Sequence, residues 1–234
     1  EVDRMSALLI SLGLGRDNIV IVQMPNCVEQ FVVYLACIRL GLIVSPVPIQ
    51  FREHELDQIV QLTQARAAVT FSEIAVGREP HAAAAMWLAL RSRHTSMQHV
   101  MCWGPNAPEE CCDIASNLPP ADSACRERVL IAQRDAAITA NDVITVCWTS
   151  GTEAAPKGVP RSHNEWLIVA PSIIEAGQLR PRARLLNPFP LINMAGLSTA
   201  FAAWLVLGAT VVQHQPFSLS VFLQQLRDES IDRK

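Results

Sequence analysis

Short apolar runs alternate with helical patterns along the first hundred residues of the chain. The runs Asn18–Met24 and Leu42–Val47 are continuous and rich in β-branched residues, which is typical of buried strands. Between them, Glu29–Leu40 carries apolar residues at helical spacing, and Gly41 follows where a helix C-cap belongs. A strand, a helix and a strand with short connections predict a βαβ unit whose two strands are parallel.

The same alternation continues as far as residue 103. It predicts a helix, a strand, a helix and a strand in turn, at Glu53–Arg66, Ala67–Phe71, His81–Arg93 and His99–Trp103. The fold class that follows is α/β, doubly wound, with mostly parallel sheets and flanking helices.

The later segments are less regular. Gly104–Arg134 contains four prolines, several acidic residues and little periodicity, so we expect it to be a surface connection. A helix is predicted at Ser162–Ala176, with Pro171 as a kink or a break. A short strand is predicted at Leu185–Asn187, and a last helix at about Ser218–Arg227.

Met194–Val212 is a 19-residue, mostly apolar stretch without a charged residue, which is long enough to span a bilayer. A membrane-anchored protein is an interpretation that rests on this stretch alone. Gly208 and the β-branched residues after it instead fit a buried helix at Ala195–Leu207, a glycine cap and a short strand. The flanks also lack the Lys/Arg asymmetry of a membrane span. We therefore expect a globular core and no integral membrane span.

The composition limits the classes of partner. The chain has 234 residues, of which 50% are hydrophobic and 18% charged, with a net charge of −3. This length supports one large domain or one and a half. Because no basic run is present, we predict no nucleic-acid partner. The chain begins at Glu1 without a signal-peptide pattern, and we expect it to be a fragment of a longer, cytoplasmic protein.

The seven cysteines form no C-x-x-C pair, which argues against zinc binding. Cys27, Cys37 and Cys147 lie within apolar runs and are predicted to be core thiols in a reducing compartment. Cys111–Cys112 and Cys125 lie in a polar stretch and are the candidates for reactive thiols.

The strongest candidate chemistry lies in Val143–Asn164, VITVCWTSGTEAAPKGVPRSHN. Its apolar start predicts a buried strand, which gives way to the hydroxyl- and glycine-rich Thr149–Thr152 and then to Pro156–Gly158. Such a loop can fold its N–H and hydroxyl groups around phosphate oxygens, while Lys157 supplies a positive charge. It is not a Walker A loop, because that loop needs a glycine directly before the lysine and Ser or Thr after it.

The order of these residues resembles the AMP-binding signature of the adenylate-forming superfamily, which includes acyl-CoA synthetases, aryl-acid ligases, luciferases and peptide-synthetase adenylation domains. The chain departs from the signature at Ala154, where glycine or serine is usual. The resemblance implies the first part of the large N-terminal domain of such an enzyme. Residues 1–180 would form a first α/β subdomain that ends in the phosphate loop and its following helix. Residues 181–234 would begin a second, incomplete subdomain.

Two groups of site residues are implied by this resemblance. The ATP phosphates would be bound by Thr149, Ser150, Gly151, Thr152, Glu153 and Lys157. The segment Phe189–Leu197 resembles the family's acyl-pocket motif, with Ile192, Asn193, Met194 and Gly196 as candidate lining residues. Asn193 and Met194 are also compatible with ordinary core or turn positions. Most acyl-CoA synthetases carry an aromatic residue and a histidine where this chain has Ile192 and Asn193, whereas aryl-acid ligases often have an asparagine nearby. We predict that Trp148 is a packing anchor and that His163 caps or packs against a helix; no residue is assigned as catalytic or metal-binding.

The function implied by the resemblance is that of an ATP-dependent carboxylate ligase. A fatty or aryl acid would attack the α-phosphorus of ATP, giving an acyl-adenylate, and a thiol, commonly that of coenzyme A, would displace AMP. The partners would be the acid, ATP and coenzyme A, with Mg²⁺ bridging the phosphates. The oligomeric state is left open, and a homodimer is one of the alternatives.

Several parts of the family's machinery are absent from the sequence, including the adenine and ribose motifs, the acidic Mg²⁺ residue and the C-terminal lysine. We therefore expect the 234 residues alone to be inactive. The alternative is a non-catalytic, truncated or degenerate relative that serves as a binding module, which Ala154, Ile192 and Asn193 favour.

Overall fold

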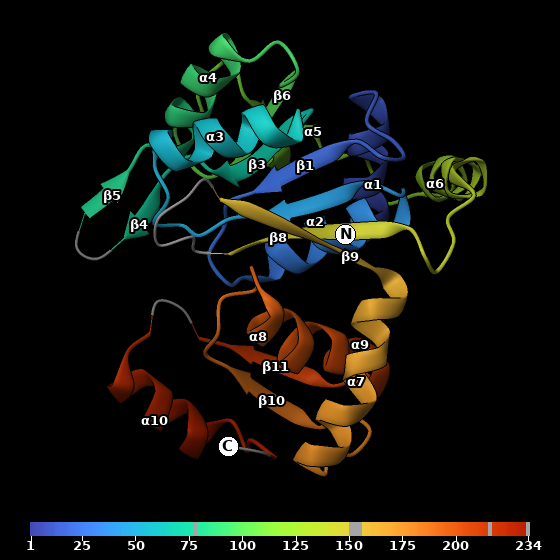
Figure 1. The fold of residues 1–234 in the computed structure, drawn as a ribbon, viewed down its shortest axis with the longest axis vertical. Helices are drawn as coiled ribbons and strands as arrows, with labels where there is room; N and C mark the ends of the chain where they lie inside the picture. The colour runs from blue at the N-terminus through green and yellow to red at the C-terminus, as the bar shows by residue number, and fades with distance from the viewer. Residues whose placement is uncertain (77–78, 150–155, 215–216, 233–234) are drawn as a thin grey trace.

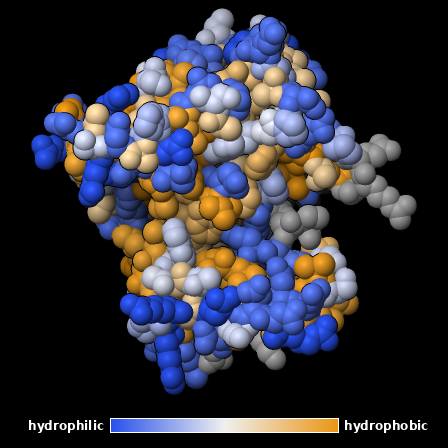
Figure 2. All heavy atoms as spheres, turned by 180° about the vertical axis from the view of Figure 1, so that it is seen from behind, coloured by the Kyte–Doolittle hydropathy of each residue, from blue (hydrophilic) through white to orange (hydrophobic). Residues whose placement is uncertain are grey.

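The protein folds into two α/β layers that meet along one junction (Figure 1). The structure is a computed structural model that describes residues 1–76, 79–149, 156–214 and 217–232. The upper layer in the figure is built on a seven-stranded sheet, and the lower, orange and red layer on a two-stranded sheet. Seen from behind, apolar residues form a band at the level where the two layers meet (Figure 2).

The large sheet has the strand order β7-β6-β3-β1-β2-β8-β9. In that order its strands are Cys112–Asp113, His99–Trp103, Ala67–Phe71, Ile19–Val22, Ile43–Pro46, Val143–Thr149 and Lys157–Ser162. Neighbouring strands are parallel except for β8 and β9, which form an antiparallel pair. The predicted parallel βαβ unit is thereby confirmed.

Helices cover both faces of this sheet, which explains why its central strands are mostly apolar. Val20 and Val22 pack into one core with α1 (Val2–Ser11) and α2 (Val28–Arg39). Ile21 points to the opposite face, toward α3 (Glu53–Thr63) and α4 (Ala83–Arg93). A small hairpin of β4 (Ile74–Val76) and β5 (Glu79–His81) follows β3.

The second layer pairs β10 (Arg184–Asn187) with β11 (Thr210–Gln213) in parallel. A continuous helical run connects them: α8 (Met194–Gly196), a π-helical turn (Leu197–Ala202) and α9 (Ala203–Leu207). Helix α7 (His163–Gly177) packs against this run, and α10 (Leu219–Asp228) closes the layer. The division at residue 180 stays a prediction.

The uncharged stretch Met194–Val212 is a helical run followed by a strand, as expected. Gly208 ends the run in the left-handed conformation, with φ +59°, which glycine adopts without steric cost. Among the described residues, no helix has both the length and the apolar character that a membrane crossing needs.

The structure differs from the sequence-based picture at three places. Gly104–Arg134 is not an irregular connection, because it contains β7, α5 (Ile114–Asn117) and most of α6 (Ser123–Ala136). Helix α6 buries only Cys125 and Val129, so its charged sequence shows no apolar stripe. Pro171 does not break α7, which continues past it to Gly177. The segment after Pro156 is not only loop: it forms strand β9 at the end of the sheet.

Candidate active site: the β8–β9 hairpin and the adjacent cavity

The two ends of the predicted phosphate loop are held side by side by the β8–β9 hairpin. Thr149 ends β8, Lys157 begins β9, and the two residues are cross-strand partners. The Thr149 hydroxyl donates to the backbone carbonyl of Lys157 at 3.5 Å. Both side chains are exposed, so they are open to a ligand. The other predicted phosphate-binding residues, Ser150, Gly151, Thr152 and Glu153, lie outside the described residues.

Gly158 allows the hairpin to close. A Cβ atom at this position would lie 2.7 Å from Val146 Cγ1 and 3.3 Å from two ring carbons of Trp148. These two side chains therefore occupy the space that a larger residue at position 158 would need. Packing against Val146 and Trp148 therefore explains why a glycine, Gly158, follows the lysine of the sequence motif.

A cavity of about 180 Å³ lies beside the hairpin at the junction of the two layers. Its lining is mostly apolar and comes from both layers: Pro46, Pro48, Phe51, Trp148, Thr149, Ile192 and Asn193. The structure thus brings Thr149, from the predicted phosphate loop, together with Ile192 and Asn193, from the predicted acyl-pocket motif.

The other two predicted pocket residues do not line this cavity. Met194 is exposed, at 40%. Gly196 is buried, and a Cβ atom there would lie 2.1 Å from the carbonyl oxygen of Pro190. Gly196 is therefore required for the close approach of two backbone segments. The pocket roles of all four residues stay predictions.

Asn193 has a structural task in addition to its place in the cavity. Its Oδ1 accepts hydrogen bonds from the backbone N–H groups of Ala195 at 3.1 Å and Gly196 at 3.5 Å, which makes it the N-cap of α8. Since the cap occupies Oδ1, the Nδ2 amide is the Asn193 donor that remains for a ligand. Because the predicted pocket motif also begins helix α8, a residue type that caps helices is found at position 193.

The wall formed by Pro48 and Phe51 is held by a residue that sequence analysis missed. Gln23, fully buried, donates from Nε2 to the carbonyl oxygens of Pro48 at 3.2 Å and Phe51 at 3.0 Å. Trp87 Nε1 donates to Gln23 Oε1 at 2.8 Å. A signal was present, because Gln23 is a polar residue inside the apolar run Asn18–Met24.

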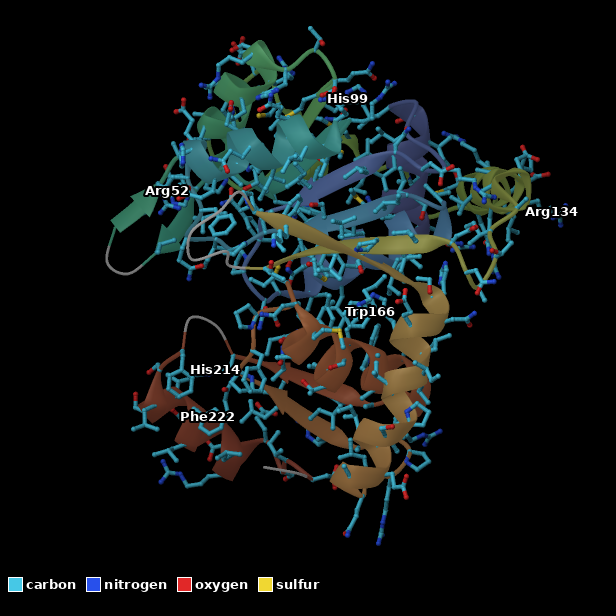
Figure 3. All side chains as sticks on the ribbon, in the orientation of Figure 1. Arg52, His99, Arg134, Trp166, His214 and Phe222 are labelled. Carbon is cyan, nitrogen blue, oxygen red and sulfur yellow. The ribbon has the colours of Figure 1, made fainter. Side chains whose placement is uncertain are left out.

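The segment after β10 is fastened to the first layer by side-chain hydrogen bonds. Asn26 Nδ2 donates to the Phe189 carbonyl at 2.8 Å, and its Oδ1 accepts from the Leu191 N–H at 3.0 Å. Trp166 Nε1 donates to Thr145 Oγ1 at 2.8 Å, so α7 is also tied to β8. Figure 3 shows Trp166 at the junction of the two layers. These hydrogen bonds join the two layers whose residues line the cavity.

Histidine 163 opens α7 and lies against the same junction. The cap is provided by Ser162, whose hydroxyl accepts from the Glu165 N–H while the Glu165 carboxylate accepts from the Ser162 N–H. Burial lowers the pKa of His163, which the charge of Asp142 partly opposes. A neutral ring on a packed helix end agrees with the expectation of a packing histidine.

The cysteines of the described structure are free thiols. Burial raises the pKa of Cys27 and Cys37 to about 12, which favours the unreactive thiol form. Of the candidates for reactive thiols, Cys111 and Cys125 are buried, which argues against their reactivity, whereas Cys112 is half-buried. Within the described ranges, no group of three or more His, Cys, Asp or Glu side chains is placed to hold a metal ion.

Comparison with known proteins decides the family. The family model described as AMP-binding enzyme matches residues 1–232. The chain belongs to the AMP-binding enzyme family. The hairpin with Thr149 and Lys157 lies within the matched residues.

Several relatives of this chain are named as CoA ligases. It is 29% identical over 163 residues to the 2-hydroxy-7-methoxy-5-methyl-1-naphthoate–CoA ligase of Streptomyces carzinostaticus, covering 70% of the chain and 28% of the relative. It is 24% identical to the crotonobetaine/carnitine–CoA ligase of Citrobacter koseri, covering 97% of the chain and 41% of the relative. The chain thus spans less than half the length of either protein.

A solved structure shows the same fold. The N-terminal domain of FACL13 from Mycobacterium tuberculosis superposes with a TM-score of 0.75 at 20% identity, covering 98% of the chain and 52% of that structure. The chain therefore has the architecture of the first part of an N-terminal domain of this kind.

Proposed function

We propose that the protein containing this chain is an ATP-dependent carboxylate–CoA ligase, which forms an acyl-adenylate and then an acyl thioester. One observation carries the proposal: a single cavity brings Thr149, beside Lys157, together with Ile192 and Asn193. Phosphate-binding groups and an apolar pocket must be adjacent if a carboxylate is to reach the α-phosphorus of ATP. The CoA ligase names of the relatives support the same reaction class.

The chain's own residues would act mainly by positioning and by charge. Attack of a carboxylate on phosphorus needs both anions held in line and the leaving pyrophosphate neutralised. The Thr149 hydroxyl would donate to a phosphate oxygen, and the Lys157 ammonium would offset the charge of the β- and γ-phosphates. The predicted partners Ser150, Gly151, Thr152 and Glu153 would complete the loop. Mg²⁺ would enter bound to ATP, and no ligand of the ion is assigned in this chain.

The lining of the cavity supports an apolar acyl group. Phe51, Trp148 and Ile192 offer apolar surface, and the Asn193 amide offers a hydrogen-bond donor. A fatty or aryl acid fits this chemistry better than a highly charged acid. We further propose the division into residues 1–180 and 181–234, with the active site completed by segments that the longer relatives have beyond it.

The experiment is a carboxylate-dependent exchange of pyrophosphate into ATP, run on the longer protein with a panel of aliphatic and aryl acids. Exchange above background with at least one acid is the expected result. A panel without any exchange would contradict the proposal and favour the alternative of a non-catalytic binding module. The 234-residue chain, assayed in parallel, should form no thioester, because it covers less than half of its CoA ligase relatives.

A further inference from the structure

Trp148 connects three strands at the base of the phosphate-loop hairpin. Strands β2 and β8 pair in parallel, with Val44 opposite Thr145. Three residues further along β8, the indole N–H of Trp148 donates to the hydroxyl of Ser45 at 2.9 Å. Ser45 is fully buried on β2. This side-chain bond therefore ties β8 to the sheet where the strand approaches the loop.

The other side of the same ring rests on β9. Trp148 and Gly158 are cross-strand partners, and the space above Gly158 is closed by the outer carbons of the indole. The next pair along the hairpin is Thr149 and Lys157. Because the ring is held by Ser45 at one edge and lies against Gly158 at the other, its position determines where Thr149 and Lys157 emerge from the sheet.

The ring also faces the cavity. Trp148 lines it together with Phe51 and Ile192, whereas Ser45 is not among the lining residues. A change at Ser45 therefore affects only the anchoring of the ring. A change at Trp148 affects both the anchoring and the width of the cavity.

We infer that Trp148 is a positioning residue for the phosphate-loop hairpin and, with the same ring, a wall that limits the size of the acyl group. The inference rests on the proposed function, since it assigns a task within that site. The hydrogen bond to Ser45 sets the position of Thr149 and Lys157 relative to the ATP phosphates, and the indole surface sets the room left for the carboxylate substrate.

The experiment compares Trp148→Phe, Ser45→Ala and their double variant in the longer protein, with Trp148→Ala as the variant that opens the wall. Trp148→Phe and Ser45→Ala should each lower kcat for adenylation by roughly three- to tenfold, since each removes the same hydrogen bond. The double variant should lose no more than the worse single variant, because the two residues act as one unit. Transfer from preformed acyl-AMP to the thiol should change less than twofold.

The proposed role of the Trp148 ring as a wall of the cavity is tested by measuring KM for the carboxylate substrate. Trp148→Ala should raise KM for a short acid and improve the relative rate of a bulkier one, whereas Ser45→Ala should leave this ranking unchanged. Trp103→Phe is the matched control, because Trp103 is a tryptophan on β6, away from the cavity.

With an active wild type, the inference would be overturned by additive losses in the double variant, by equal losses in both half-reactions, or by Trp103→Phe behaving like Trp148→Phe. An inactive wild type would instead refute the proposed function and the inference with it. An active wild type with an unaffected Trp148→Phe variant would refute the inference alone.

Discussion

The hydroxyl of Tyr34 donates a hydrogen bond to the backbone carbonyl of Leu191 at 2.6 Å, across the junction of the two layers. Both residues are buried, and 157 positions separate them in the sequence. Gln30 Nε2 donates to the same hydroxyl at 3.1 Å, so the phenol both accepts and donates. Helix α2 is thereby fixed to the segment that leads into the cavity.

Replacement of Tyr34 by phenylalanine should lower the free energy of unfolding by about 1–3 kcal/mol, because the Leu191 carbonyl loses its phenol partner inside the protein. The ring itself stays, so packing is largely preserved. Urea unfolding of the wild type and the variant measures the difference. An unchanged unfolding free energy would contradict a stabilising role for this bond.

Lys157→Ala should lower kcat for adenylation in the longer protein by about one to two orders of magnitude, since a charge-assisted contact contributes roughly 1.5–3 kcal/mol. Transfer from preformed acyl-AMP should be much less affected, because pyrophosphate has already left. Single-turnover measurements of each half-reaction separate the two effects. Arg161→Ala is the control, a cation on the same strand that pairs with Glu165. Equal damage to both half-reactions would point to a folding role for Lys157.

Two substitutions at Asn193 should separate its cap from its place in the cavity. Asn193→Ala removes the Oδ1 acceptor and should cost about 1 kcal/mol of stability. Asn193→Asp keeps an acceptor for the Ala195 and Gly196 N–H groups, so most of the stability should remain. The new negative charge should nevertheless raise KM for the carboxylate substrate, because like charges repel. Thermal unfolding and steady-state kinetics measure the two effects. Equal stability losses in both variants would argue against the cap.

His163 should make the protein less stable as the pH falls. Burial places its folded-state pKa below the usual value of about 6.5, so the unfolded chain takes up a proton more readily. The loss of stability therefore begins as the pH falls through about 6.5 and continues down to the folded-state pKa of His163. Above this window, His163 causes no change of stability with pH. Burial lowers the pKa of His81 and His99 as well, which adds losses of the same sign.

His163→Gln should flatten the dependence of the unfolding free energy on pH between 7.5 and 5.5, because glutamine does not titrate. Denaturant unfolding at several pH values is the measurement. A slope equal to that of the wild type would show that the ring titrates alike in both states.

The parallel strands could be predicted from sequence because burial on both faces leaves a simple pattern. The bounds of β3 and β6 agree with the predicted Ala67–Phe71 and His99–Trp103. Helix α6 could not be found in this way, since it touches the core with little more than Cys125 and Val129. Strand β9 was missed because Gly158 and Pro160 interrupt the alternation that identifies a strand.

Candidate site residues could be predicted where a local motif contains them, and their roles stay predictions. Thr149 and Lys157 were recognised together because one motif contains both. The role of Gln23 depends on the loop at Pro48–Phe51 turning back over β1, and such a tertiary contact leaves no local pattern. Likewise, nothing in the spacing of Tyr34 and Leu191 indicates that they meet.

Strand β9, at the end of the large sheet, has a consequence for how the protein behaves at high concentration. An unpaired strand edge offers N–H and C=O groups to which a strand of another molecule can add. In β9, Pro160 has no N–H to offer, and the exposed Lys157 adds a positive charge at the start of the strand. The same strand of a second molecule would bring the same positive charge, and it would find no backbone N–H at Pro160 with which to form a hydrogen bond. The strand that ends the sheet among the described residues is therefore poorly suited to pair edge to edge with a copy of itself.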